Sequence, residues 1–155
     1  MKKHAAITQA EWEVLRVLWS QGASPSRKII AILNQEKGWQ ASTIKTLLNR
    51  LVKKDAVQVE KTRPAYRYEA KASEEEAMAT RLKALLHSTC QRNASDLLCQ
   101  LLQLAPLDKD MKAQIEHCLA EKETVPEVLC TCPPGQCTCQ HHTKPANANR
   151  SASDH

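Results

Sequence analysis

The 155-residue sequence contains no phenylalanine, and three tryptophans and two tyrosines are its only aromatic side chains. It also lacks any apolar run near the roughly 20 residues that a membrane-spanning helix needs. The first residues, MKKHAAITQAEWEVL, carry charges where a secretory signal has an unbroken apolar segment. We therefore expect a cytoplasmic protein without a membrane partner.

The sequence also lacks the residue patterns of common enzymes. It contains no glycine-rich phosphate-binding loop and no recognisable set of nucleophile, base and orienting residue. We therefore expect a protein that is not an enzyme.

The positive charge is concentrated in the first half of the chain, although the net charge of the whole is +5. Residues 1–70 hold 13 lysines and arginines against 6 acidic residues, which gives +7, while residues 71–155 hold 9 against 11, which gives −2. A basic half is typical of a protein that binds a polyanion such as nucleic acid. A solvated surface with spare lysines would give the same charge, so charge alone does not decide between the two.

The first two helices are indicated by their start signals. Thr8 and Glu11 have the spacing of a capping box, in which each side chain bonds the backbone N–H of the other residue. The helix that follows is expected to continue to Gly22. Ser24 and Pro25 predict the start of a second helix, with Ser24 as the N-cap and Pro25 in the first helical position.

A third helix is predicted from about residue 41 to residue 54. Four apolar residues recur at helical spacing and predict a buried stripe: Ile44, Leu47, Leu48 and Leu51. The opposite face contains no acid and carries hydroxyl, amide and basic side chains: Ser42, Thr43, Lys45, Thr46, Asn49, Arg50 and Lys53.

The period of the apolar residues changes from 3.6 to 2 after this helix. Apolar and polar residues alternate over residues 57–59 and again around Tyr66 and Tyr68, which predicts a β-hairpin. The connecting segment, EKTRPA, places Lys61 and Arg63 near the tip. Three helices followed by a hairpin is the order of a winged helix-turn-helix, so the fold is expected to be mainly α, with this domain at the start of the chain, in residues 1–71.

This domain has the features of a DNA-binding module. Serine and threonine hydroxyls on the third helix can reach base edges in a major groove, and lysine or arginine can meet phosphates or guanine. Lys61, Arg63 and Arg67 on the hairpin would contact the DNA backbone or the minor groove. The alternative is an ordinary three-helix domain with a solvated charged face. The acid-free helix face, the basic hairpin and the charge of the first half together favour DNA binding.

Residues 72–124 are expected to form a helical dimerisation domain. Ser73 and Glu76 form a second capping box, a leucine-rich helix is expected over residues 94–104, and Asp108 is expected to cap a third helix. These helices are too few and too short to close a core of their own. A second copy of the chain is the simplest partner for their leucine faces, so we expect a homodimer.

The remaining segment, residues 125–155, is expected to be a flexible metal-binding tail, disordered after its last cysteine. Its stretch CTCPPGQCTC contains two Cys-x-Cys pairs, formed by Cys130, Cys132, Cys137 and Cys139. Pro134 and Gly135 suit the centre of a type II turn that folds the pairs toward each other. Four converging thiolates at about 2.3 Å suit Zn(II). Soft thiolates also select Cu(I), which tolerates a lower coordination number, so four thiolates can hold more than one copper ion.

Other roles for the cysteines rank lower. Thiols stay reduced in the cytoplasm, which disfavours disulfides, and iron–sulfur ligands are usually spaced more widely than Cys-x-Cys. Cys90, Cys99 and Cys118 lie in or beside leucine-rich segments and are expected to be small apolar core residues. His141 and His142 follow the cluster, but four sulfurs already complete a zinc shell, so we expect these histidines to be solvated.

Three segments resemble the penicillinase repressor family of winged-helix regulators (BlaI and MecI): ITQAEWEVLRVLW, STIKTLLNRLVKK and the tyrosine-containing hairpin. The resemblance spans roughly residues 5–120. It implies a homodimer that binds inverted repeats in promoters and dimerises through its C-terminal helices. Carried over by position, it implies that Ser42, Thr43 and Thr46 read bases, with Trp39 and Arg50 nearer the DNA backbone.

The missing phenylalanine bears on how such a repressor is switched. The penicillinase branch is switched by cleavage at an Asn-Phe bond in the dimerisation region, and this chain contains no phenylalanine. We therefore expect a different signal to release the DNA.

The Cys-x-Cys-x4-Cys-x-Cys tail on such a body resembles the CopY-type copper-responsive repressors of Gram-positive bacteria. This resemblance implies that the Zn(II) form binds an inverted repeat of the form TACAnnTGTA upstream of copper-homeostasis genes. Cu(I), two ions per cluster, then displaces zinc and the repressor leaves the DNA, and a copper chaperone is a further partner that this role implies. Two other functions stay open: a penicillinase-type repressor with a structural zinc hook, and a metal-buffering or chaperone protein.

Overall fold

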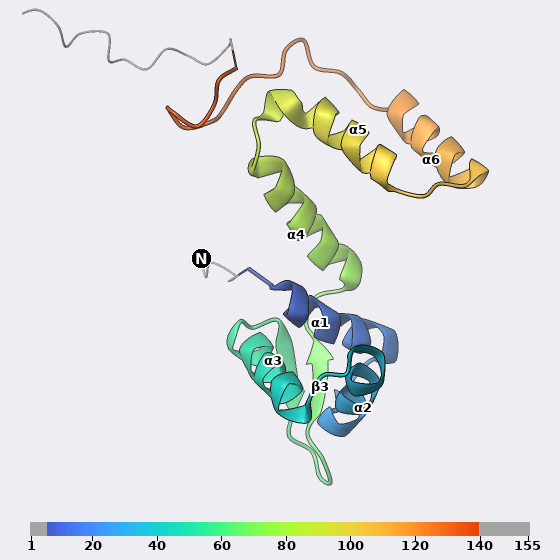
Figure 1. The fold of residues 1–155 in the computed structure, drawn as a ribbon, viewed down its shortest axis with the longest axis vertical. Helices are drawn as coiled ribbons and strands as arrows, with labels where there is room; N and C mark the ends of the chain where they lie inside the picture. Colours follow the sequence, from blue (N-terminus) through green and yellow to red (C-terminus); the bar gives the residue numbers. More distant parts are fainter. Residues whose placement is uncertain (1–5, 140–155) are drawn as a thin grey trace, which may run out of the picture. The chain divides into compact units, whose positions relative to one another are not determined.

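The computed structural model describes residues 6–139, and the chain divides into two compact units, Met1–Thr80 and Arg81–His155. His141, His142 and the end of the tail therefore lie outside the described residues. The first unit contains, in order, α1 (Gln9–Gln21), β1 (Ser24–Pro25), α2 (Ser26–Lys37), α3 (Ala41–Lys53), β2 (Val57–Glu60) and β3 (Arg67–Ala70) (Figure 1). The division falls within α4 (Glu74–His87), after which come η1 (Gln91–Asn93), α5 (Ala94–Leu104) and α6 (Lys109–Ala120). Among the described residues, none of the helices has the length and apolar character needed to cross a membrane.

The predicted capping box at the start of α1 is confirmed. The Thr8 backbone N–H donates to Glu11 Oε2 at 2.9 Å, and the Glu11 N–H donates to Thr8 Oγ1 at 3.2 Å. The helix ends at Gly22, whose φ of 71° is unfavourable for a residue with a Cβ. The sequence therefore determines both ends of α1 locally.

The expected start of the second helix is wrong in detail. Ser24 and Pro25 form the short strand β1, which pairs antiparallel with β3, with Ser24 opposite Tyr68. The Ser24 hydroxyl donates to the Gly22 carbonyl at 3.0 Å instead of capping α2, and Pro25 occupies the N-cap position without a side-chain bond. Pairing with β3, a strand more than forty residues away, determines the extended conformation of Ser24 and Pro25. No local sequence signal indicates this pairing.

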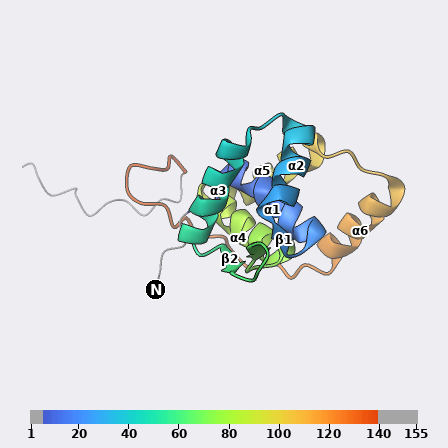
Figure 2. The same ribbon diagram turned by 90° about the horizontal axis from the view of Figure 1, so that it is seen from below.

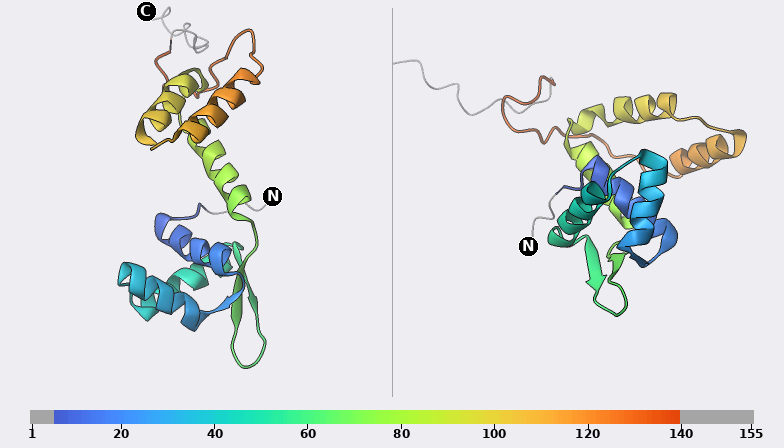
Figure 3. Two further views of the ribbon diagram at one scale, coloured as in Figure 1. Left: turned by 90° about the vertical axis from the view of Figure 1, so that its right-hand side faces the viewer. Right: turned by 60° about the horizontal axis from the view of Figure 1, so that its bottom comes forward.

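The predicted hairpin is present and belongs to a three-stranded sheet of order β1-β3-β2. β2 and β3 pair antiparallel with Val57 opposite Ala70 and Val59 opposite Tyr68. β3 begins at Arg67 and is therefore shorter than the alternation of Tyr66 and Tyr68 predicts. Tyr66 lies before the strand and is 55 % exposed. The loop between the strands extends away from the three helices (Figure 3). Three helices followed by this hairpin make the unit a winged helix-turn-helix.

The core of the first unit forms where α1, α2 and α3 pack on one another and on the sheet (Figure 2). It includes the whole predicted stripe of α3, together with residues of α1, α2 and β2: Val14, Leu15, Val17, Leu18, Ile29, Leu33, Ile44, Leu47, Leu48, Leu51 and Val57. Trp19 Nε1 donates to the Ala72 carbonyl at 2.9 Å and so fixes the chain after β3 against α1. This packing holds α3 with its polar face outward.

The helices α4, α5 and α6 bury no residue within the single chain. The predicted start signals of α4 and α6 are confirmed: Ser73 and Glu76 bond reciprocally at 3.1 and 2.9 Å, and the Asp108 side chain accepts from the Met111 N–H at 2.8 Å. α5 and α6 are joined by a loop and run in opposite directions (Figure 1). Large apolar side chains stay exposed along all three helices: Met78, Leu82, Leu85, Leu86, Leu98, Leu101, Leu102, Leu104, Met111 and Leu119.

Two cysteines on these helices are not core residues as expected. Cys99 on α5 and Cys118 on α6 are exposed. The reason is that an amphipathic stripe predicts burial only where another element covers it, and nothing in the described chain covers these faces. Cys90 is buried, but its neighbours are sulfur atoms.

Candidate metal centre and nucleic-acid interface

The cysteine-rich segment folds around the predicted turn. The Gln136 N–H donates to the Pro133 carbonyl at 3.2 Å, which closes a four-residue turn with Pro134 and Gly135 at its centre. Gly135 has a φ of 82°, the positive value that a type II turn requires at this position. The turn brings Cys132 and Cys137 toward each other from its two sides.

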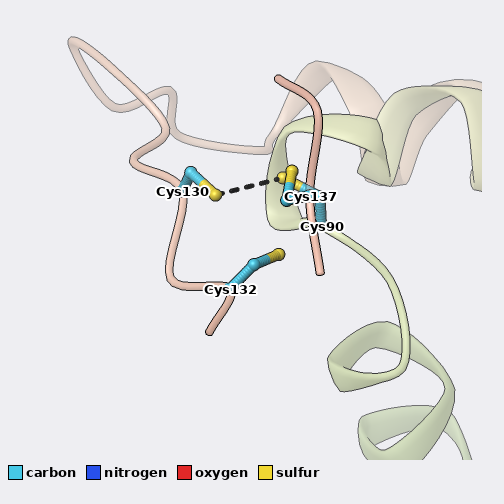
Figure 4. Close-up of side chains that lie close together, drawn as sticks. All are labelled: Cys90, Cys130, Cys132 and Cys137. Carbon is cyan, nitrogen blue, oxygen red and sulfur yellow. Dashed lines mark hydrogen bonds between the residues drawn. The ribbon is translucent and has the colours of Figure 1, made fainter. Parts of the chain in front are cut away.

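Four thiols converge at this turn, and one of them comes from outside the tail. The sulfur atoms of Cys90, Cys130, Cys132 and Cys137 all lie within 4.8 Å of one another. Figure 4 shows the four side chains pointing toward a common centre, with Cys90 Sγ 3.7 Å from Cys130 Sγ. The structure thus brings together three of the four predicted ligands and adds a fourth sulfur that sequence reasoning assigned to the core.

Cys139, the remaining predicted ligand, lies beside this group. Its backbone N–H donates to Cys137 Sγ at 3.4 Å. A hydrogen bond to a sulfur atom is a typical contact of the outer shell of a metal site. Five cysteines therefore lie together in one small region. That the four tail cysteines bind a metal ion stays a prediction.

Cys90 occupies a defined place in the second unit. It lies between the end of α4 and η1, and its carbonyl accepts from the Asn93 N–H at 2.9 Å. Two residues further on, Arg92 Nη1 donates to the Val128 carbonyl at 2.8 Å and lies 3.8 Å from Glu127 Oε1. These contacts hold the segment before Cys130 against the start of α5.

The thiols differ in their readiness to lose a proton. Desolvation and the neighbouring thiols of Cys130, Cys90 and Cys137 raise the pKa of Cys132 to about 12. The backbone N–H and the thiol of Cys139 lower the pKa of Cys137. A metal ion takes thiolates rather than thiols, so binding here releases protons and weakens as the pH falls.

The donor set fits a soft or borderline metal ion. Four sulfurs held at about 2.3 Å from a tetrahedral centre are about 3.8 Å apart, close to the 3.7 Å between Cys90 Sγ and Cys130 Sγ. An all-sulfur set suits Zn(II) and selects Cu(I) among softer ions. Cys90, Cys132 and Cys137 also line an open cleft of about 680 Å³, whose other lining residues are 87–89, 91, 93, 131, 133, 135, 136 and 138, and the cleft gives an incoming ion access.

The second candidate site is the outward face of α3. Each of the seven residues predicted on this face is exposed, while the apolar stripe behind it is buried. The Thr46 hydroxyl donates to the Ser42 carbonyl at 2.9 Å, so its oxygen can serve a ligand as an acceptor. Trp39, expected near the DNA backbone, is half-buried and packs against the core.

The hairpin adds two exposed cations to this unit. Lys61 and Arg63 lie in the loop between β2 and β3 and are exposed. Arg67, also expected to face DNA, donates from Nη2 to the Ala23 carbonyl at 2.6 Å and so ties β3 to the segment before β1. Arg67 therefore positions the hairpin through this bond.

A comparison with known families matches residues 7–121 to the penicillinase repressor family. The chain belongs to this family. A 16.5 kDa uncharacterised protein from the ptsI 3′ region of Latilactobacillus sakei is 38 % identical over 136 residues, covering 86 % of this chain and 93 % of its own. The methicillin resistance regulatory protein MecI of Staphylococcus aureus strain N315 is 24 % identical over 116 residues, covering 75 % and 94 %.

Among solved structures, the DNA-binding domain of the repressor BlaI is 33 % identical, with a TM-score of 0.44, and covers 49 % of this chain and 93 % of its own. A CopR repressor structure is 38 % identical, with a TM-score of 0.38, and covers 44 % and 100 %. The region matched to the penicillinase repressor family ends at residue 121 and so includes Cys90 but not the four tail cysteines.

Proposed function

We propose that this protein is a sequence-specific, copper-responsive repressor of copper-homeostasis genes. Membership of the penicillinase repressor family supports the repressor function, as do the names of its relatives, which include MecI and penicillinase repressors. The observation that carries the copper response is the convergence of four thiols within 4.8 Å. An all-sulfur site favours soft ions such as Cu(I), and the resemblance of the Cys-x-Cys-x4-Cys-x-Cys tail to CopY-type repressors supports copper among them.

DNA recognition would use α3 and the hairpin in different ways. In a winged helix the exposed face of α3 enters the major groove, where Ser42, Thr43 and Thr46 meet base edges. Lys61 and Arg63 would contact phosphates and fix the orientation without reading sequence. A homodimer formed through the exposed apolar faces of α4–α6 would present two copies of α3 to an inverted repeat such as TACAnnTGTA.

The thiolates would act as the sensor. Four of them complete a tetrahedral shell for one Zn(II), and the same sulfurs can be shared between two Cu(I) ions, which accept two or three ligands each. The exchange alters how the tail is held against the start of α5 and so changes the preferred dimer geometry. Such coupling requires that the two metal forms differ in their free energy between the DNA-binding and the released state. The open cleft would let a copper chaperone deliver the ion.

An anaerobic DNA-binding titration tests this function. The Zn(II)-loaded protein should bind a fluorescent TACAnnTGTA duplex, and Cu(I) should release it near two ions per chain. A Cys132→Ser, Cys137→Ser double variant is the matched control: it should bind the duplex more weakly than the Zn(II)-loaded wild type, and Cu(I) should not change its affinity. If Cu(I) leaves the affinity of the wild-type protein unchanged, the tail is a structural zinc hook. If the wild-type protein takes up copper but never binds the duplex, it is a metal buffer or chaperone.

A further inference from the structure

We propose that Cys90 is a metal ligand of this centre, and that it attaches the metal to the helical unit rather than to the tail alone. This inference rests on the proposed metal response and deepens it. It assigns a ligand that lies forty residues before the Cys-x-Cys-x4-Cys-x-Cys segment, outside any pattern in the sequence.

The position of the Cys90 sulfur is the first reason. Cys90 Sγ lies in the group of four sulfurs within 4.8 Å, and its distance of 3.7 Å from Cys130 Sγ is near the edge of a zinc tetrathiolate. Cys130, Cys132 and Cys137 provide three ligands, so a tetrahedral ion needs only one more. Cys90 and Cys139 are the two thiols near enough to compete for that place.

Burial is the second reason. Within the described part of the second unit, residues 81–139, Cys90 is the only buried residue, while leucines on α4–α6 stay exposed. The tail therefore covers the one thiol between α4 and η1 and leaves larger apolar side chains open. Apolar burial alone would favour the leucines over a single small thiol. A function of the sulfur atom explains better why Cys90 is the residue that is buried.

The supporting contacts are the third reason. Arg92 bonds the Val128 carbonyl at 2.8 Å and lies beside Glu127, so the tail is aligned next to Cys90 before any ion binds. The Cys139 N–H donates to Cys137 Sγ, the contact of an outer-shell group. We therefore assign Cys90, Cys130, Cys132 and Cys137 to Zn(II). Cys139 supports Cys137 and supplies a fifth thiolate when Cu(I) requires shared sulfurs.

This assignment gives the metal a path to the helices. Ligation by Cys90 and Cys130 closes a loop that contains η1, α5 and α6 in full. Each ligating cysteine gives up its proton to solvent, so the closure depends on the metal and on pH. The state of the ion then restrains the two helices whose exposed leucines face the expected partner subunit.

Cadmium-113 NMR tests the assignment without changing the protein. Cadmium replaces zinc in thiolate sites, and a correlation between the cadmium and cysteine Hβ protons identifies each ligand directly. We expect correlations to Cys90, Cys130, Cys132 and Cys137 in the full-length protein. A spectrum with the four tail cysteines and no Cys90 would overturn the proposal.

The second readout is the zinc affinity of single variants, measured by chelator competition. Cys90→Ser and Cys139→Ser are compared with Cys99→Ser, which replaces an exposed cysteine and serves as the control. Loss of an outer-shell partner costs about 10–100-fold in affinity, so Cys90→Ser should cost at least about 100-fold and Cys139→Ser less. Cys99→Ser should match the wild type. Circular dichroism of the metal-free variants shows whether the helices are retained. Equal affinities for Cys90→Ser and wild type would refute the ligand, whereas failure of copper to release DNA refutes only the proposed function.

Discussion

At the scale of single residues, Glu11 links the start of α1 to the end of α3. Its side chain is 1 % exposed, and Oε2 accepts from the Thr8 N–H and lies 2.6 Å from Lys54 Nζ. Desolvation raises the pKa of Glu11, but the contacts with Lys54 and Thr8 outweigh it, so the pKa is lowered. Lys54 also donates to the Ala6 carbonyl at 2.7 Å, which brings the N-terminal segment into the same group.

We predict that Glu11→Gln destabilises the protein by about 1–3 kcal/mol at neutral pH, because Lys54 loses its charged partner in a buried setting. A lowered folded-state pKa means that Glu11 contributes its full stabilisation above its unfolded pKa, about 4.3. That contribution is lost as the pH falls through the folded-state pKa. The difference in unfolding free energy between wild type and variant should therefore shrink in acid, as urea denaturation at several pH values can measure.

Glu13→Gln is the matched control for this prediction. Glu13 lies two residues further along α1, and its longer ion pairs, 3.8 Å to Arg16 and 3.6 Å to Lys37, have partners that are substantially exposed. Exposed pairs contribute about 0–1 kcal/mol. An equal loss in both variants would contradict a special role for the buried carboxylate.

At the scale of elements, substitutions in α3 and in the hairpin are expected to change DNA binding in different ways. Thr43→Ala removes a hydroxyl from the exposed face of α3 and should lower affinity for the operator by about 1–2 kcal/mol, roughly 5- to 30-fold, with little effect on unrelated DNA. Arg63→Ala should weaken both DNAs alike and reduce the slope of log affinity against log salt by about 0.9, the value of one phosphate contact. Fluorescence anisotropy at several salt concentrations separates the two effects.

Lys112→Ala is the control for the change in charge, since Lys112 is an exposed lysine on α6. It should leave both the affinity and the salt slope unchanged. If Thr43→Ala and Arg63→Ala gave the same pattern, α3 would not be the element that reads sequence.

The exposed leucine faces lead to a prediction about α5. Leu98 is 54 % exposed in the single chain, and we expect a second subunit to cover it. Leu98→Glu should raise the dimer dissociation constant at least tenfold, because burying a leucine contributes about 1.5–3 kcal/mol. Sedimentation equilibrium measures this shift, and Gln100→Glu on the same helix adds the charge without removing the leucine. A dimer unchanged by Leu98→Glu would show that this face lies outside the interface.

The elements also show what the sequence can and cannot predict. Caps and stripes depend on residues three or four apart, so Thr8 with Glu11, Asp108 with Met111, and the buried face of α3 could be foreseen. The strand at Ser24 depends on β3, and the contact of Cys90 with Cys130 depends on a tail that returns after two helices. Neither has a local signal. The two Cys-x-Cys pairs indicated a metal site, but they did not show which element of the fold the metal would hold.

At the scale of the whole molecule, the metal centre and the dimer should be linked. Cys90 and Cys130 enclose η1, α5 and α6 between them, and the apolar faces of α5 and α6 are the expected contact with the second subunit. If the metal restrains these helices, then zinc favours the dimer. By thermodynamic linkage the dimer must then bind zinc more tightly than the monomer, and the factor on the dimer constant is the square of the factor per zinc site, because each dimer holds two sites. Because of this reciprocity, the coupling can be measured both as a change in zinc affinity and as a change in dimer stability.

We predict that the zinc affinity per site of the monomeric Leu98→Glu variant is lower than that of the wild-type dimer by the square root of the factor with which zinc tightens the wild-type dimer, because each dimer holds two zinc sites. Allosteric coupling is typically about 1–3 kcal/mol, or 5- to 150-fold. Chelator competition gives the first factor, and the square root of the ratio of the dimer constants from sedimentation with and without zinc gives the second. Cys90→Ser should bring the second factor close to one, because zinc bound by the tail alone no longer closes the loop around α5 and α6. Two factors well above one in the wild type and close to one in Cys90→Ser would trace the coupling to this one thiol. Equal zinc affinities in monomer and dimer would place the switch elsewhere in the chain.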